Sequence, residues 1–151
     1  MAEHSETRRV PFAQQALFDL VADVERYPEF LPHMLATRVT RRDGNSVHVD
    51  MLLGMGIWRR RIASVGILQP PDRIDITSED PPFRQFALHW RFRPVSTRAT
   101  EVELRAKFVF RSKLYQRLLD ASFKTEVAAM VEAFERRARE VHGSELKPRR
   151  A

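Results

Sequence analysis

Residues 23–32 read DVERYPEFLP, and this stretch decides where the chain leaves its first helix and begins a sheet. Apolar residues before it recur at helical spacing, which predicts a helix over residues 12–25. Pro28 disfavours helical geometry in the residue before it, so we expect the helix to end at Tyr27. Residues 28–34 are then expected to form a short tight segment, such as a single helical turn.

Two prolines, Pro28 and Pro32, bracket an aromatic and an aliphatic side chain, Phe30 and Leu31. Each proline fixes its own φ and restricts the residue before it, so the segment between them is stiff. Such a segment can hold Phe30 and Leu31 over the mouth of a cavity at little cost in conformational entropy. The alternative is an interhelical corner with a hydrophobic plug.

Period-two alternation of apolar and polar residues predicts strands along much of the remaining chain. Turn signals separate them, and Asp43-Gly44-Asn45 is a strong hairpin signal. Apolar residues occupy one side of each strand, which is typical of an antiparallel sheet packed on one face. The expected strands cover residues 3–10, 36–42, 47–53, 59–68, 74–76, 83–92 and 102–110.

A helical period replaces the strand period at Ser112, a residue type suited to an N-cap, and Gly143 is a natural stop. A helix between them would be about 45 Å long. A helix of that length is longer than is needed to cover the sheet, so we expect a bend or a frayed start near residues 112–117. One sheet, two short helical pieces after its first strand and one long helix predict a single α+β domain over residues 1–143. The basic tail, residues 144–151, is expected to be disordered.

The 151-residue chain has a formal net charge of +6 and no cysteine, which excludes a disulfide framework and a cysteine metal site. No signal peptide and no apolar run near the roughly 20 residues of a membrane span is visible, which predicts a cytoplasmic protein. Clustered arginines predict a basic surface that suits the phosphates of an anionic membrane or of RNA, unless it only aids solubility. These are Arg59, Arg60, Arg61, Arg136, Arg137 and Arg139.

No motif in the chain requires chemistry to explain it. The five histidines lack metal-ligand spacing, and phosphate-binding loops and nucleophile motifs are absent. His89 has the opposite strand parity to Leu88 and Trp90, which puts it on the outer face. The adjacent carboxylates Glu79 and Asp80 should point apart. We therefore expect no enzyme activity, no metal and no catalytic cofactor.

Arg59 and Arg61 conflict with the inward face expected for their strand. They share parity with its apolar residues, which are Ala63, Val65 and Ile67. Three explanations stay open: the strand begins later, it is bulged, or an arginine lies at the end of a cavity.

Apolar faces from the first helix, the proline-bracketed segment, several strands and the long helix all contribute to one interior. Bulky faces on a curved sheet can leave a cavity, and ligand sites are lined in this way. For each single residue, ordinary core packing is the alternative. The candidate ligand-binding residues are Tyr27, Pro28, Phe30, Leu31, Pro32, Met34, Met51, Leu53, Phe83, Phe86, Leu88, Trp90, Phe92, Leu118, Phe123, Val127 and Met130.

Three longer stretches carry a resemblance to a known family. They read LFDLVADVERYPEFLP at 17–32, PPFRQFALHWRFRP at 81–94 and MVEAFERRA at 130–138. Together they resemble the coenzyme Q-binding protein family, a branch of the START-like, polyketide cyclase-related superfamily. The resemblance implies a helix-grip fold, in which a curved antiparallel sheet of six or seven strands wraps around the C-terminal helix and encloses an apolar tunnel.

The resemblance also implies a ligand, ubiquinone or a related isoprenoid lipid, held by a carrier or chaperone that supports respiratory electron transport. The family's Tyr-Pro-x-Phe-Leu-Pro motif corresponds to Tyr27, Pro28, Phe30, Leu31 and Pro32. Its aromatic strand corresponds to Phe83, Trp90 and Phe92. His33 and Met34 stand where the family commonly has Trp and Cys.

The same branch includes bacterial toxins that block the association of ribosomal subunits, which is the alternative function. The expected partners are thus a hydrophobic small molecule and either the inner face of the cell membrane or the ribosome, with no DNA. A cyclase or aromatase, as in distant relatives, is a third hypothesis. It is disfavoured because no acid/base pair faces the inferred cavity.

Overall fold

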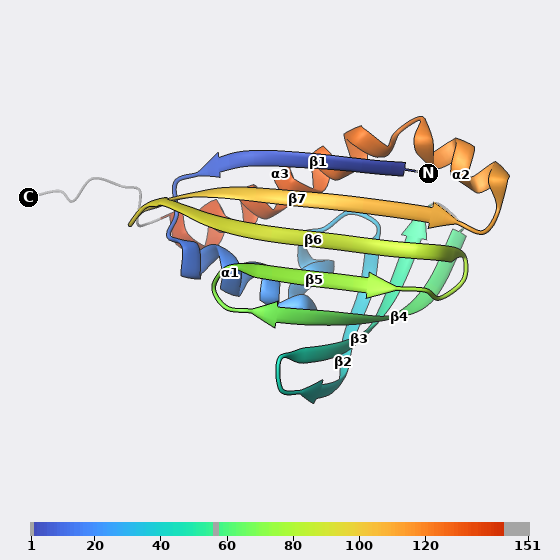
Figure 1. The fold of residues 1–151 in the computed structure, drawn as a ribbon, viewed down its shortest axis with the longest axis horizontal. Helices are drawn as coiled ribbons and strands as arrows, with labels where there is room; N and C mark the ends of the chain where they lie inside the picture. Colours follow the sequence, from blue (N-terminus) through green and yellow to red (C-terminus); the bar gives the residue numbers. More distant parts are fainter. Residues whose placement is uncertain (1, 56–57, 144–151) are drawn as a thin grey trace, which may run out of the picture.

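The computed structural model describes residues 2–55 and 58–143, and the expected basic tail, residues 144–151, lies outside them. Its seven strands form one antiparallel sheet in the order β1-β7-β6-β5-β4-β3-β2 (Figure 1). The strands are β1 (Ala2–Val10), β2 (Met34–Asp43), β3 (Ser46–Met55), β4 (Trp58–Gln69), β5 (Arg73–Ser78), β6 (Phe83–Ser96) and β7 (Ala99–Phe110). The expected α+β class and the antiparallel sheet are confirmed.

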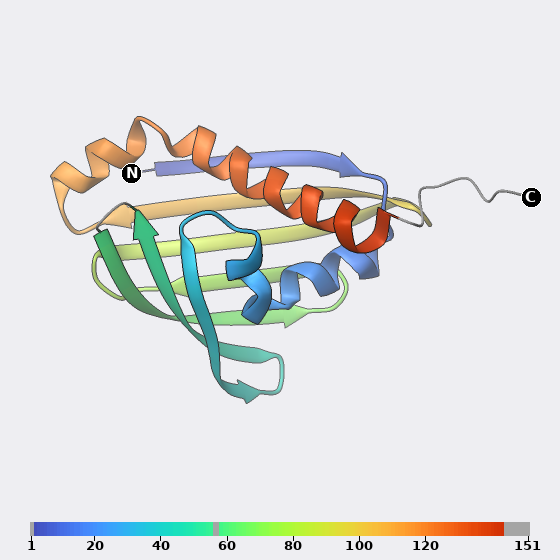
Figure 2. The same ribbon diagram turned by 180° about the vertical axis from the view of Figure 1, so that it is seen from behind.

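Two helical pieces follow β1 and two helices follow β7. They are α1 (Gln14–Ala22), the 3₁₀ helix η1 (Val24–Glu29), α2 (Lys113–Asp120) and α3 (Phe123–His142). The sheet curves, and α1 and α3 lie on the same face of it (Figures 1 and 2). Because α3 contacts β1, β7 and α1, the C-terminal helix is held against the sheet as a helix-grip fold requires.

The core lies between this face of the sheet and the two helices. Strand side chains alternate, so Ile74 and Ile76 of β5 are buried, as are Trp90 and Phe92 of β6. Across the ladder, Trp90 is paired with Ile74 on one side and with Leu104 on the other. Neighbouring strands therefore present their apolar sides to the same interior.

The expected hairpin turn joins β2 to β3. Gly44 and Asn45 form its two-residue loop, and Gly44 has a φ of +59°. A positive φ at the first loop residue suits a type II′ hairpin, and glycine adopts it without steric cost.

The first helix ends earlier than expected. It stops at Ala22. The helical turn that we expected to begin at Pro28 begins at Val24 instead, as η1, and Pro28 lies inside it. Tertiary hydrogen bonds hold this segment: the Tyr27 hydroxyl donates to the Val21 carbonyl, and Thr37 Oγ1 donates to the Val24 carbonyl at 2.7 Å. The contact with Thr37 of β2 could not be read from local spacing.

The long C-terminal helix is broken, and not at residues 112–117 as expected. The break lies between α2 and α3, where Ser122 has φ −121° and ψ 1°. Gln116 binds α2 to β7, because its Oε1 accepts from the Phe110 amide at 2.7 Å. The other two expected ends are confirmed: Ser112 caps α2, and Gly143 ends α3.

The inward face of β4 was assigned wrongly from the sequence. Val49 and Met51 of β3 are buried and pair with Ser64 and Ile62, so Ile62 and Ser64 face inward. Arg61 lies on the opposite, outer face. The sequence misled because Ser64 is polar but faces inward, whereas apolar residues such as Val65 and Ile67 lie on the outer face. Neither a late start, a bulge nor an arginine at the end of the cavity is needed.

Candidate functional site

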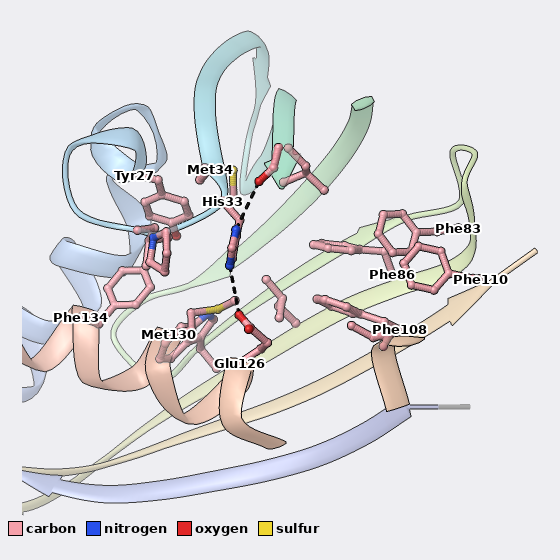
Figure 3. A pocket seen from close by; sticks show the side chains of 17 residues that line it. Tyr27, His33, Met34, Phe83, Phe86, Phe108, Phe110, Glu126, Met130 and Phe134 are labelled. Atoms are coloured by element: carbon pink, nitrogen blue, oxygen red, sulfur yellow. Dashed lines mark hydrogen bonds and ion pairs between the residues drawn. The ribbon is translucent and has the colours of Figure 1, made fainter. Parts of the chain in front are cut away.

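An apolar cavity of about 140 Å³ lies between the sheet, the rim of residues 31–34 and α3 (Figure 3). Its lining comes from six strands and helices and from the rim. The lining residues are Tyr27, Leu31, Pro32, His33, Met34, Leu53, Gly54, Phe83, Phe86, Leu88, Trp90, Phe108, Phe110, Leu119, Glu126, Met130 and Phe134.

Aromatic rings form the two ends of the cavity. At one end, Phe83 stacks on Phe110 with ring centroids 4.7 Å apart, and Phe86 stacks on Phe108 at 4.6 Å. At the other end lie Tyr27 and Phe134, whose rings meet edge to face at 5.4 Å. Figure 3 shows these groups on opposite sides, with α3 along one wall. A flat or unbranched apolar group therefore meets ring faces and ring edges at both ends of the cavity.

Tyr27 carries a polar group at the end formed with Phe134, and that hydroxyl is already hydrogen-bonded. The hydroxyl donates to the Val21 carbonyl, and the residue is 2% exposed. Burial raises the pKa of the Tyr27 phenol well above its ordinary value, and the negative charge of Asp23 raises it further. The phenol therefore stays protonated and offers the cavity only its ring.

Polar groups gather instead at the mouth. His33 Nε2 lies 3.2 Å from Glu126 Oε2, and these two side chains are 43% and 36% exposed. Both residues line the cavity, so the cavity reaches the surface between the rim and α3. The mouth is thus polar while the interior is apolar.

The backbone holds His33 in place. Its φ is 69°, the one positive value among the described non-glycine residues. Its carbonyl accepts from the Gly54 amide at 2.9 Å, and its Nδ1 lies 3.2 Å from the Gly54 carbonyl. A carbonyl only accepts, so Nδ1 carries the proton of that hydrogen bond. The imidazole is therefore positioned by β3 with Nε2 directed toward α3.

The structure brings ten of the candidate ligand-binding residues together around this cavity. They are Tyr27, Leu31, Pro32, Met34, Leu53, Phe83, Phe86, Leu88, Trp90 and Met130. They come from η1, the proline-bracketed segment, three strands and α3, so residues far apart in sequence meet at one cavity.

Seven candidates do not line it. Met51, Phe92, Phe123 and Val127 are buried in the core outside this cavity, and Phe92 lines a second, smaller cavity of about 20 Å³. Phe92 also meets the ring of Phe18 at 5.9 Å. Pro28 lies inside η1 and not in the wall.

Phe30 and Leu118 point elsewhere. Phe30 packs on the ring of Phe134 at 5.0 Å and lies under the Arg137 guanidinium at 5.3 Å, outside the cavity. Of the bracketed pair, only Leu31 lines it. Leu118 is 65% exposed because it shares the outer face of α2 with Leu114, whereas Leu119 lies one turn after Gln116, which binds β7, and lines the cavity.

Sequence reasoning missed seven lining residues: His33, Gly54, Phe108, Phe110, Leu119, Glu126 and Phe134. A signal existed for three of them. Phe108 and Phe110 continue the inward alternation of β7, and Phe134 lies one helical turn after Met130. The polar mouth carried no sequence signal, because His33 and Glu126 are remote from one another in the chain.

The arginines expected to form one basic surface are divided. Arg59, Arg60 and Arg61 are exposed at the start of β4. Arg136, Arg137 and Arg139 lie near the end of α3, at the opposite end of the molecule (Figure 1). Arg137 is paired with Glu29 at 2.7 Å and is only 18% exposed, so it is a poor contact for a phosphate.

Among residues 2–55 and 58–143, no group of histidine and carboxylate side chains is arranged to hold a metal ion. No described helix combines the length and apolar character that crossing a bilayer demands.

The chain matches the family described as polyketide cyclase / dehydrase and lipid transport over residues 10–135. The ribosome association toxin RatA of Pseudomonas aeruginosa is 31% identical over 134 residues, which cover 89% of this chain and 93% of that protein. The mitochondrial coenzyme Q-binding protein COQ10 of Dictyostelium discoideum is 25% identical, over 91% of this chain and 69% of that protein.

A solved structure shares the fold. The Zhui aromatase/cyclase from Streptomyces sp. R1128 superposes with a TM-score of 0.82 at 17% identity, covering 93% of this chain and 95% of that chain. The family match spans most of the chain, and the cavity lies between sheet and helix, as expected of a fold that holds hydrophobic ligands. The chain belongs to the polyketide cyclase / dehydrase and lipid transport family.

Proposed function

We propose that the chain binds one amphiphilic apolar ligand, a polyprenyl quinone such as ubiquinone, and acts as its carrier or chaperone without transforming it. One observation carries the proposal: the cavity is lined by aromatic and aliphatic side chains, and its polar groups, His33 and Glu126, stand at the mouth. This distribution suits a ligand with an apolar body and one polar end.

The size of the cavity limits what it can hold. At about 140 Å³ it is close to engineered apolar cavities of ~150 Å³, which stay dry and take up benzene. A quinone-sized ring or a single isoprene unit therefore fits the closed cavity. The rest of a polyprenyl chain has to extend through the mouth, or the mouth has to open.

The absence of catalysis is part of the proposal. The Tyr27 phenol is buried, protonated and already hydrogen-bonded, so it does not present a proton to a substrate. His33 and Glu126 are bound to each other at the surface. The likeness to an aromatase/cyclase concerns the fold, whereas the COQ10 relative supports a quinone as ligand.

Two measurements test the proposal. Protein purified under native conditions is extracted with organic solvent, and the extract is analysed by mass spectrometry; a quinone at near-stoichiometric amount is expected. The stripped protein is then titrated with ubiquinone-2 in a Trp58→Phe background, in which Trp90 of the cavity wall is the remaining tryptophan. Saturable quenching of Trp90 is expected.

Absence of both a co-purifying lipid and saturable quenching contradicts ligand binding. A stoichiometric lipid of another class, with no response to ubiquinone-2, contradicts the quinone assignment but leaves an apolar ligand in place. A product formed from the bound quinone contradicts the non-catalytic role.

A second candidate function is binding to the ribosome, as a regulator that blocks subunit association. Two observations favour it: identity to the RatA toxin is 31%, against 25% to the COQ10 protein, and the chain carries a net charge of +6. Binding to ribosomal RNA through arginines should weaken steeply with salt.

Sucrose gradients test this candidate. Purified protein is added to dissociated ribosomal subunits, which are then allowed to associate. A smaller 70S peak and protein in the subunit fractions, both reversed by salt, are expected if the candidate is right. An unchanged profile at low salt eliminates it.

A further inference from the structure

Helix α2 presents an apolar face to solvent. Leu114 and Leu118 are each 65% exposed, and Tyr115 is 40% exposed. The two leucines are one helical turn apart and therefore share a face. Of the six large apolar side chains that are exposed in the described residues, this eight-residue helix carries three. Scattered single apolar residues are ordinary on a surface, but a group on one short helix is not.

The orientation of α2 is set by its opposite face. Gln116 Oε1 accepts from the Phe110 amide at 2.7 Å, and Gln116 Nε2 donates to the Phe108 carbonyl at 3.3 Å. Leu119 lines the cavity. Because these contacts bind one side of α2 to β7 and to the cavity wall, Leu114 and Leu118 cannot turn inward without breaking them.

Basic side chains flank the leucines. Lys113 and Arg117 are exposed, one turn apart, and form a row beside Leu114 and Leu118. The acidic residue of the helix, Asp120, accepts from Gln116 Nε2 at 3.0 Å on the other side. Figure 1 places α2 and the start of β4 at the same end of the molecule, away from the end of α3. The exposed arginines Arg59–Arg61 add positive charge at this end.

We propose that this face of α2 docks on the surface of an anionic lipid bilayer. Interfacial helices combine these features: apolar side chains enter the boundary between headgroups and acyl chains, and neighbouring cations meet anionic headgroups. RNA would match the cations but leave Leu114 and Leu118 unsatisfied. In a two-fold dimer the face would meet itself and bring Lys113 and Arg117 against like charges.

Docking goes beyond ligand binding and does not depend on which ligand the cavity takes. Docking would also bring the cavity close to the bilayer, because Leu119 on the inner side of α2 forms part of the cavity wall. Docked through Leu114 and Leu118, the protein holds one wall of the cavity against the bilayer. An apolar molecule can then pass between bilayer and cavity with little exposure to water.

The test is flotation of lipid-stripped protein with vesicles of phosphatidylcholine, with and without phosphatidylglycerol, at low and high salt. The intact chain is expected to float with the anionic vesicles, and less so at high salt. Leu114→Ser combined with Leu118→Ser should weaken this binding about tenfold or more, because two leucines leave the interface. Lys113→Gln with Arg117→Gln should weaken binding to the anionic vesicles alone.

The matched control is Val95→Ser combined with Val141→Ser. These valines are 46% and 51% exposed and belong to the ends of β6 and α3. Their loss removes two exposed apolar side chains without touching α2, and binding should stay unchanged. Circular dichroism and thermal melts check that each variant is folded, which is expected because all the substituted side chains are exposed.

The inference is overturned if the intact chain fails to float with anionic vesicles, if the double-serine variant binds as well as the intact chain, or if the valine control loses as much binding. A dimer of the intact chain that the double-serine variant abolishes, without vesicle binding, also overturns it and assigns the face to a second copy. If a lipid is extracted from the purified protein but the protein does not float with vesicles, membrane docking is wrong while the proposed ligand binding stands.

Discussion

The Nε2 atom of His33 lies 3.2 Å from Oε2 of Glu126, so the rim and α3 meet across the mouth of the cavity. Gly54 holds His33 from its other side through two hydrogen bonds. A ligand that enters from the surface between the rim and α3 passes beside this contact. The pair therefore lies where exchange of a ligand would be controlled.

Replacing Glu126 by alanine should accelerate ligand exchange. Half-exposed ion pairs contribute about 0.2–1 kcal/mol, so dissociation of ubiquinone-2 should become up to about fivefold faster. Stopped-flow fluorescence of Trp90 measures the rate. Glu132→Ala removes the same charge from an exposed site on the same helix and should leave the rate unchanged. Equal rates for both variants would show that the contact does not control the mouth.

A charge in the wall should abolish uptake. Met130 lines the cavity, and Met130→Glu places an unpaired carboxylate against an apolar ligand, which is costly. Saturable quenching by ubiquinone-2 should disappear, while the fold is retained because Met130 is only partly buried. Thr125→Glu adds the same charge to the exposed side of α3 and should bind as the natural chain does. If the Met130→Glu variant still binds ubiquinone-2, the ligand lies outside this cavity.

Removing the Tyr27 hydroxyl should destabilise the fold. Tyr27→Phe leaves the buried Val21 carbonyl without its donor, at a cost of about 1–3 kcal/mol in the free energy of unfolding. Urea denaturation measures it. Tyr115→Phe, at an exposed position, should cost less than about 0.5 kcal/mol. Equal stability of the two variants would mean that the Tyr27 hydrogen bond contributes nothing.

Phe134 should be the side chain on which the helix–sheet contact most depends. Its ring contacts three others: Trp90 at 4.8 Å, Phe30 at 5.0 Å and Tyr27 at 5.4 Å. Phe134→Ala should therefore lower the free energy of unfolding by about 3–5 kcal/mol. Val141→Ala, an exposed position of the same helix, serves as the control in urea titrations. A loss below about 1.5 kcal/mol for Phe134→Ala would show that the neighbouring rings collapse into the space.

Strand periodicity was sufficient to assign the inward face of a strand where that face is uniformly apolar. On β6 the alternation placed Trp90 inward and His89 outward, and the structure agrees: Trp90 is 1% exposed, and His89 pairs with Asp75 at 2.6 Å on the other side. The same reasoning failed on β4. There Ser64 faces inward because it is paired with Val49, and only the register with β3 shows this.

The sequence predicted part of the cavity lining but not which neighbouring side chain faces it. The proline-bracketed segment does bring Leu31 and Pro32 to the cavity. Phe30 of the same segment instead packs on Phe134 and under Arg137, outside the cavity. Likewise, Leu119 lines the cavity instead of Leu118, because Gln116 on the same face of α2 is bound to β7.

The amino-acid order alone determined the α+β class, the apolar sides of most strands and the stiff corner around Leu31, since backbone propensity and periodicity are local properties. Only the tertiary structure decided which bulky side chains interlock and which leave a space, and that His33 meets Glu126 at its mouth. A cavity is the small volume left over when curved sheet, broken helix and rim are assembled. Its walls therefore depend on registers and helix phases that no short stretch of sequence contains.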